Sequence, residues 1–409
     1  MPSSEFRHVI DMNISIYVYK FPPDTDVGGR RWGLFVTQLA TQGHKIAVTT
    51  TNAQEKRKYW ASSHPDLPIS FREMPTTWFA TNSGRNLTSR ARWHIEKQIL
   101  QFLHAGRVYD KTIAQSKVLE NYVTQDCVHN IDVIIVSCAP FRWSLHIGET
   151  LARFKKRPKY FIDLRDPWSR NRLSYFNNLS NKRLTEESLI EEQAVGSADG
   201  IIVTHEAMLK HYPKKQTVYI PNNIEVPEGT WPLLRIEKTL KLIFPGTLYK
   251  GGESLLSRFL QLTKEANPDK RIQLTLLGNW KSSLIHRIES TCEVDYLGIV
   301  PREEVAPLIR QHHYVLSYVS KKLPYAINTK ALEAVENRTP IIFLGENAFQ
   351  NFIVENNIGW EFKASMSKND LAEKFTSATK FGPFVQKEFS RQHSIKILLD
   401  FIQNGTKTN

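Results

Sequence analysis

The sequence predicts an α/β protein of two domains, each built around a parallel β-sheet. The chain has 409 residues, which is long for one hydrophobic core and suits two domains of about 200 residues each. Short apolar runs rich in β-branched residues alternate with helical patterns, as in sheets whose strands are connected by helices. This alternation breaks off near residues 221–232 and then starts again, so two sheets are expected.

Five predicted strands lie in the first half of the chain. They are Ile14–Tyr19, Ile46–Thr50, Val133–Ser137, Tyr160–Leu164 and Ile201–Val203. Between the first two, the apolar face of a predicted helix consists of Trp32, Phe35, Val36, Leu39 and Ala40. Gly43 is placed to end this helix, because glycine readily adopts the left-handed conformation found after helix ends. The first unit is therefore predicted as strand, glycine loop, helix and strand.

Four more predicted strands follow the break. They are Leu240–Phe244, Ile272–Leu277, Tyr314–Ser317 and Pro340–Phe343. The break is rich in proline and asparagine, as interdomain connections often are. We therefore expect an N-terminal domain over residues 1–228 and a C-terminal domain over residues 229–388. Residues 389–409 include the apolar run Ile395–Ile402 and are expected to form a helix that packs back on the body, with the N-terminal domain as candidate partner.

The charge and cysteine content limit the classes of partner and compartment. The formal net charge is +13, from 54 Lys and Arg against 41 Asp and Glu, which favours nucleotide phosphates, an anionic membrane or nucleic acid as partner. No zinc-finger spacing or RNA-binding signature is present, so nucleic acid is not expected. The three cysteines are widely spaced, which favours a reducing cytoplasm. No apolar stretch approaches the ~20 residues that span a bilayer, so a soluble or peripheral protein is expected.

Residues 85–120 are locally basic, with Lys and Arg outnumbering Asp and Glu. Apolar residues in this region keep helical spacing, and Trp93 and Tyr109 suit a lipid headgroup boundary. Two interpretations stay open. One is peripheral contact with the inner face of the plasma membrane, and the other is a solvated helix packed on its own domain.

A glycine pair follows the first predicted strand, within Asp26-Val27-Gly28-Gly29-Arg30-Arg31. Gly28 and Gly29 let the backbone approach a ligand closely, and the start of the following helix attracts anions. These two glycines are therefore candidates for binding an anionic ligand. An ordinary tight turn is the alternative.

Charged residues follow the strand Tyr160–Leu164, at the end where α/β sheets place functional groups. Asp163, Arg165 and Asp166 are catalytic candidates here, because an aspartate at such a position is suited to deprotonate a hydroxyl or to stabilise developing positive charge on a substrate. The alternative is an ion pair of Asp163 with Arg165 that orders the loop and leaves Asp166 free. His205 follows the next predicted strand and is a further catalytic candidate, without partners at metal-ligand spacing.

Several short segments resemble, in order, those of glycosyltransferases with the GT-B fold. In the first half they are Phe21-Pro22-Pro23, Gly28-Gly29, Leu39-Ala40-Thr41-Gln42-Gly43-His44, Asp163-Leu164-Arg165-Asp166-Pro167-Trp168, Ala198-Asp199-Gly200-Ile201-Ile202-Val203-Thr204 and Ile220-Pro221-Asn222-Asn223. In the second half they are Phe244-Pro245-Gly246-Thr247-Leu248-Tyr249-Lys250-Gly251, Leu277-Gly278, Tyr296-Leu297-Gly298 and Lys330-Ala331-Leu332-Glu333-Ala334. The resemblance is to the large, mostly retaining, family 4-like group that includes many bacterial polysaccharide enzymes. It implies two facing Rossmann-like domains.

The resemblance also implies where the substrates bind. A nucleotide diphosphate sugar, such as a UDP-sugar, is expected mainly on the C-terminal domain, and the acceptor on the N-terminal domain across the cleft. Positive side chains and helix starts aimed at the departing diphosphate stabilise its charge, so no metal ion or other cofactor is expected. Lys250 and Lys330 are the candidates for this contact, with Asn328 or Thr329 capping the helix at Lys330. For each lysine, a solvated surface position is the alternative.

The sequence departs from the family at two positions. Glu333 matches the second glutamate of the family's paired signature, which accepts hydrogen bonds from ribose hydroxyls. The first glutamate lies beside the sugar in relatives, and its position is Tyr325 here, so the signature does not imply how the sugar is recognised. Thr247 stands where many relatives have the arginine of a phosphate clamp. Lys250 is therefore expected to contact the phosphates without that second basic residue.

The sequence thus predicts a metal-independent glycosyltransferase that moves a sugar from a nucleotide diphosphate to a hydroxyl of a glycan or lipid-linked acceptor. Synthesis of a surface polysaccharide, such as lipopolysaccharide or capsule, is the expected setting, and retention of configuration is expected from the family's prevalence. Two alternatives stay open. One is a nucleotide-sugar 2-epimerase on the same scaffold, and the other is a non-catalytic partner subunit of a polysaccharide complex.

Overall fold

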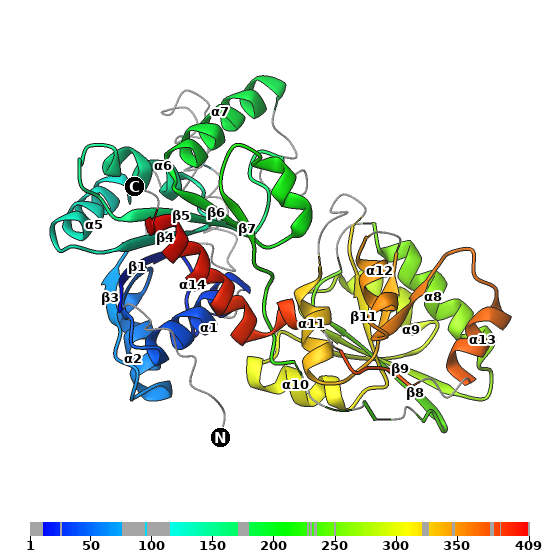
Figure 1. The fold of residues 1–409 in the computed structure, drawn as a ribbon. Helices are drawn as coiled ribbons and strands as arrows, with labels where there is room; N and C mark the ends of the chain where they lie inside the picture. The colour runs from blue at the N-terminus through cyan, green and yellow to red at the C-terminus, as the bar shows by residue number, and fades with distance from the viewer. Residues whose placement is uncertain are drawn as a thin grey trace. The chain divides into compact units, whose positions relative to one another are not determined.

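The computed structural model describes residues 11–24, 27–75, 95, 115–170, 180–226, 229, 231–232, 235–248, 251–320, 327–345, 348–376, 380–384 and 386–407. The chain divides into two compact units, each with its own parallel sheet (Figure 1). Unit 1 comprises Met1–Pro221 together with Ser394–Asn409, and unit 2 comprises Asn222–His393. The chain thus leaves unit 1 slightly before the expected boundary near residue 228.

Unit 1 contains seven parallel strands in the order β3-β2-β1-β4-β5-β6-β7. They are β1 (Asn13–Val18), β2 (Lys45–Thr50), β3 (Ser70–Glu73), β4 (Val133–Cys138), β5 (Lys159–Leu164), β6 (Gly200–Val203) and β7 (Thr217–Tyr219). The five strands predicted from apolar runs are confirmed. The sequence analysis missed β3 and β7, which are short strands at the two edges and are only partly buried.

Helices cover both faces of this sheet. They are α1 (Val27–Thr41), α2 (Ala53–Ser63), α5 (Ser116–Val128), α6 (Arg142–Leu151), α7 (Asn181–Ser197) and the second part of α14 (Arg391–Lys407). Strand β1 shows the division, because Ile14 and Ile16 join the core beneath α1, while Tyr17 joins the core on the opposite face. The predicted end of α1 is confirmed, since Gly43 has φ 91° and donates its N–H to the carbonyl of Ala40.

Unit 2 contains six parallel strands in the order β10-β9-β8-β11-β12-β13. They are β8 (Thr239–Pro245), β9 (Arg271–Leu277), β10 (Glu293–Gly298), β11 (Tyr314–Tyr318), β12 (Ile341–Leu344) and β13 (Gly359–Phe362). The helices described here are α8 (Glu253–Ala266), α9 (Ser282–Glu289), α10 (Arg302–Arg310), α11 (Thr329–Glu336), α12 (Ala348–Glu355) and α13 (Lys368–Thr376). All four strands predicted in this half are confirmed, and the two that were missed, β10 and β13, again lie at the edges.

The C-terminal helix α14 begins in unit 2 and packs in unit 1. Its apolar side chains Leu398 and Ile402 are fully buried in the core that also contains α1. The ring of Phe401 lies 5.4 Å from that of Phe161 on β5. The last helix is therefore part of the hydrophobic core of unit 1. None of the helices in the described ranges is both long and apolar enough to cross a bilayer.

Candidate functional site

A buried polar centre lies at the carboxyl end of β5 in unit 1. One carboxylate oxygen of Asp163 accepts a hydrogen bond from Arg31 Nη2 (3.1 Å). The other accepts from Trp32 Nε1 (2.8 Å) and Ser137 Oγ (3.1 Å). Arg31 also donates to the carbonyl of Pro221 (2.7 Å). Asp163 is fully buried. The centre connects α1, β4 and β5 with Pro221, after which the chain leaves unit 1.

The proposed pairing of Asp163 with Arg165 is wrong, because Asp163 pairs with Arg31. Arg165 lies beyond the end of β5, and its Nε donates instead to the carbonyl of Cys138 (3.1 Å). Its guanidinium rests directly against the first turn of α1, where a Cβ on Gly28 would overlap it. Gly28 therefore makes room for the arginine side chain, and the glycine pair has at least this packing role.

Asp166 is exposed at the surface of a well-anchored loop. The protein around it nevertheless desolvates its carboxyl group enough to raise the pKa, with Arg165 acting in the opposite direction. Two glutamates of α7 hold the residues that follow. Glu187 accepts from Trp168 Nε1 (3.1 Å), and Glu191 accepts from the backbone N–H of Ser169 (2.9 Å). The structure thus presents Asp166, and not Asp163, to solvent.

His205 lies just past the end of β6 and is buried, with 7% of its surface exposed. Burial and the nearby charge of Arg31 lower its pKa to about 4. The imidazole is therefore neutral at physiological pH, next to the buried centre of Asp163 and Arg31. It is suited to accept or donate a hydrogen bond there and not to carry charge.

In unit 2, Lys330 lies in the first turn of α11 and faces the end of β8. The predicted capping is confirmed, since Asn328 Oδ1 accepts from the backbone N–H of Lys330 (3.0 Å). Asn328 Nδ2 donates to Ser317 Oγ (3.1 Å), which ties the cap to β11. The ammonium of Lys330 occupies the space beside Gly246, where a Cβ would overlap it. Gly246 has φ 124°, a backbone conformation that favours glycine, and the absence of a side chain leaves the space that the ammonium occupies.

Burial and two neighbouring charged residues determine the electrostatics around Lys330. Burial lowers the pKa of the Lys330 ammonium, and Glu333 opposes this effect. Glu333 lies one turn further along α11 and forms an ion pair with Arg302 Nη1 (2.6 Å). The sequence analysis did not single out Arg302, because a lone arginine at a helix start has no signal until its partner is known. Lys330 and the Arg302–Glu333 ion pair therefore lie at the start of α10 and α11.

The other predicted residues are placed as follows. Thr247 is exposed after β8, and its Oγ1 accepts from the backbone N–H of Asn279 (3.3 Å). Gly29 packs against the loop that follows β1, and Thr329 is the first residue of α11. Lys250, Tyr325 and most of residues 85–120 lie outside the described residues. Among the residues that are described, no three His, Cys, Asp or Glu gather at a candidate metal site.

Comparison with known proteins gives structural matches only, because no protein-family model and no curated protein sequence matches the chain. A mutant of S. aureus TarM in complex with Fondaparinux, alpha-GlcNAc-glycerol and UDP is similar with a TM-score of 0.58 at 12% identity, covering 97% of this chain and 100% of TarM. A glycosyltransferase from Rickettsia africae gives 0.57 at 11% identity, covering 97% and 100%. UDP-GlcNAc 2-epimerase from Methanocaldococcus jannaschii gives 0.55 at 10% identity, covering 96% and 100%. The chain therefore has the GT-B fold.

Proposed function

We propose that the protein is a glycosyltransferase that uses a nucleotide diphosphate sugar, with UDP as the preferred nucleotide. The observation that carries the proposal is the position of Lys330, whose partly desolvated ammonium lies at a glycine turn beside a capped helix start. A pyrophosphate is the ligand that such a combination of cation and helix N–H groups suits best. The similarity to a TarM complex that contains UDP supports the choice of nucleotide.

The same groups supply the catalytic effect that the reaction needs. When the bond between sugar and diphosphate breaks, negative charge grows on the departing phosphate. Lys330 and the start of α11 stabilise this charge without moving, so the transferase needs no divalent cation. Glu333, held in place by Arg302, accepts hydrogen bonds from the ribose hydroxyls.

Unit 1 supplies the acceptor side of the reaction. Asp166 is the exposed acid of the segment, and its raised pKa suits proton transfer with an acceptor hydroxyl. Asp163, Arg31 and neutral His205 form the buried support behind it. The acceptor is a glycan or lipid-linked hydroxyl in surface polysaccharide synthesis, and we expect retention of configuration, as in most of the family that the sequence resembles.

Calorimetry with UDP tests the donor site. We expect Lys330→Ala to weaken UDP binding by about tenfold or more, as loss of a charge-assisted hydrogen bond does. Glu333→Ala should weaken UDP more than it weakens inorganic pyrophosphate, because the latter has no ribose. Lys264→Ala, at an exposed lysine of α8, is the matched control and should bind UDP normally. Unchanged UDP affinity in both site variants would exclude this donor site.

Turnover measurements test the chemistry. Once a thermal-shift screen of nucleotide sugars identifies a donor, chelation of divalent cations with EDTA should leave its turnover unchanged. Asp166→Asn should reduce turnover while UDP affinity stays normal. Loss of activity in EDTA with recovery in manganese would contradict the role given to Lys330, and full turnover of Asp166→Asn would contradict the role given to Asp166.

The similarity to a UDP-GlcNAc 2-epimerase makes epimerisation the second candidate function. An epimerase converts its donor without any acceptor, whereas a transferase releases sugar from the donor only slowly in that case. NMR of UDP-GlcNAc incubated with the protein alone distinguishes them, because only the epimerase forms the 2-epimer. A non-catalytic partner subunit, the third hypothesis from the sequence, would bind none of the nucleotide diphosphates tested.

We further propose a cytoplasmic protein that contacts the inner face of the plasma membrane through residues 85–120. The net charge of +13 and the lipid-linked acceptor support this location. Sedimentation with vesicles containing phosphatidylglycerol should recover more protein than sedimentation with neutral vesicles. Equal recovery from both would exclude it.

A further inference from the structure

The loop that follows β1 is held tightly against the start of α1. A Cβ on Gly29 would lie 3.3 Å from the carbonyl oxygen of Asp24 and 3.4 Å from the carbonyl carbon of Lys20. The backbone N–H of Asp24 also donates to the carbonyl of Phe21 (3.0 Å), which closes the loop on itself. Asp24 is therefore held both by the hydrogen bond of its own backbone and by packing against Gly29.

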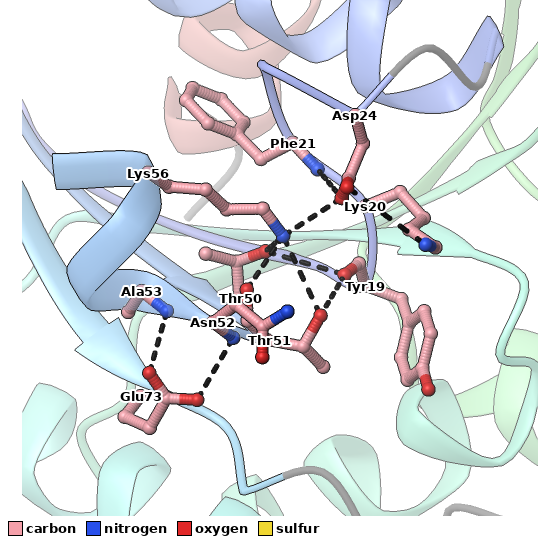
Figure 2. A network of polar contacts seen from close by, with 10 residues as sticks. All are labelled: Tyr19, Lys20, Phe21, Asp24, Thr50, Thr51, Asn52, Ala53, Lys56 and Glu73. Carbon is pink, nitrogen blue, oxygen red and sulfur yellow. Dashed lines mark hydrogen bonds and ion pairs between the residues drawn. The ribbon is translucent and has the colours of Figure 1, made fainter. Parts of the chain in front are cut away.

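A buried lysine from α2 reaches this loop (Figure 2). Lys56 is only 2% exposed, and its Nζ lies 2.9 Å from Asp24 Oδ2. The same ammonium donates to the carbonyl of Thr51 (2.6 Å) and to Thr50 Oγ1 (3.2 Å) at the end of β2. Burial lowers the pKa of Lys56, and its interaction with Asp24 opposes this. The charged end of Lys56 is thus fully engaged between the ends of two strands.

The start of α2 is held in turn by a third strand. The two carboxylate oxygens of Glu73 on β3 accept from the backbone N–H groups of Asn52 (2.9 Å) and Ala53 (2.6 Å). Asn52 has φ 52° and makes no side-chain cap of its own, so Glu73 provides the cap for α2. Figure 2 shows that these contacts form one polar network along the carboxyl ends of the strands.

The two oxygens of the Asp24 carboxylate have different surroundings. Oδ2 accepts from Lys56 and, at 3.4 Å, from the backbone N–H of Phe21. Among the described residues, Oδ1 contacts the ammonium of Lys20, which is 4.0 Å away. The Asp24 side chain is 27% exposed and that of Lys20 is 45% exposed. Within the described ranges, Oδ2 is therefore anchored by Lys56, whereas Oδ1 has only the long contact with Lys20. The partly exposed side chain lies at the carboxyl end of the sheet, where α/β proteins bind ligands.

Structure alone does not require a charged pair at this place. Burying an ammonium group costs several kcal/mol, and well-packed apolar residues replace buried ion pairs with equal or better stability in many proteins. What an apolar pair would not provide is a carboxylate held in one orientation. An ionised carboxylate accepts hydrogen bonds from two neighbouring hydroxyls, which is how proteins commonly bind sugars.

We propose that Asp24 binds hydroxyl groups of the sugar acceptor, and that Lys56 is the positioning residue that orients the carboxylate. The inference rests on the proposed function, because it gives unit 1 the acceptor. It adds a named acceptor-binding residue and its buried support.

Saturation-transfer NMR with methyl α-glucoside, methyl α-galactoside and methyl α-N-acetylglucosaminide as probes tests the proposal. The wild-type protein should bind at least one of these glycosides. Asp24→Asn should weaken that binding by about tenfold or more, as expected for a hydrogen bond to a charged group. Lys56→Met should weaken it as well and should lower the stability in urea unfolding, because Asp24 and the carbonyl of Thr51 lose their partner. Lys56→Arg should restore part of the binding.

The matched control is Lys215, another lysine of unit 1 that holds loop backbone. Its Nζ donates to the carbonyls of Gly196 and Ala198. These residues precede β6 and so lie at the amino end of that strand, opposite to the carboxyl end near Asp24. Lys215→Met should bind the glycosides normally. If the wild type binds none of the three, or Asp24→Asn binds as tightly as the wild type, the inference is overturned. Binding of UDP is measured separately, so failure of the proposed donor site would be distinguished from failure of Asp24.

Discussion

At the scale of single residues, two carboxylates three positions apart have opposite environments. Asp163 is fully buried and accepts hydrogen bonds from Arg31, Trp32 and Ser137, so all its bonding capacity serves the fold. Asp166 is exposed beyond the strand, and its pKa is raised. Residue type alone makes both candidates for catalysis. Their surroundings fit a structural role for the first and are consistent with the proton transfer that we propose for the second.

His205 should make the stability of unit 1 depend on pH. Its pKa is about 4 in the folded protein and about 6.5 when unfolded, so the unfolded chain binds the extra proton between these values. The stabilisation is complete above pH 6.5 and is lost as the pH falls to about 4, at a cost of about 3 kcal/mol. Urea unfolding at several pH values should show that His205→Gln loses that much less stability than the wild type. Parallel stability curves for the two proteins would contradict this.

At the scale of elements, the start of α11 combines a structural role with the ligand-binding role that we propose for it. Asn328 caps the helix through its side-chain oxygen, and an aspartate would cap it equally well. Its negative charge, however, would repel a diphosphate bound beside Lys330.

We therefore expect Asn328→Asp to keep the thermal stability of the wild type and to weaken UDP binding by about tenfold. Asn328→Ala should instead lower the stability by about 1 kcal/mol. Calorimetry and thermal unfolding of both variants check this. If Asn328→Asp binds UDP as the wild type does, the helix start does not contact the diphosphate.

Helix α7 acts on Asp166 through the loop that it anchors. Glu191 accepts three hydrogen bonds, from the backbone and the hydroxyl of Ser169 and from Tyr212 Oη (2.7 Å). A glutamine at this position keeps one acceptor oxygen and gains an NH2 donor, so one hydroxyl must reverse its hydrogen bond and all three bonds lose the charge of the carboxylate.

Glu191→Gln should lower kcat by about tenfold to a hundredfold, because small displacements of a catalytic group are that costly. Affinity for UDP should be unchanged, since the proposed donor site lies in unit 2. The neighbouring exposed residue provides the control, and Glu192→Gln should retain full kcat. A normal kcat in Glu191→Gln would show that Asp166 does not depend on this anchor.

At the scale of the whole molecule, the chain contains two separate hydrophobic cores, and the last helix belongs to the core of the first. Leu398→Ala should therefore destabilise unit 1 by about 2–5 kcal/mol, the usual cost of deleting a buried leucine side chain. Leu371→Ala, at a fully buried position of α13, should destabilise unit 2 instead. UDP added during urea unfolding distinguishes the units, because it stabilises only the unit that binds it. Protection of the transition weakened by Leu398→Ala would contradict the assignment of UDP to unit 2.

The sequence by itself determined the features that depend on local pattern. The buried central strands, the apolar face of α1 and its end at Gly43 all follow from the spacing of apolar residues and from backbone preference. The repetition of the α/β pattern that produces two sheets follows in the same way. For the cap of α11 the sequence offered Asn328 or Thr329, and the structure selected Asn328. These features are local because neighbouring residues in the chain decide them.

Only the tertiary structure decided which side chains become partners. Arg31 and Asp163 are 132 residues apart, and Arg302 and Glu333 are 31 apart, so no local pattern joins them. The edge strands were missed for a related reason, since their conformation depends on pairing with a neighbouring strand more than on an apolar run of their own. The different burial of Asp163 and Asp166 and the pairing of Asp24 with Lys56 likewise arise only once distant segments have packed together.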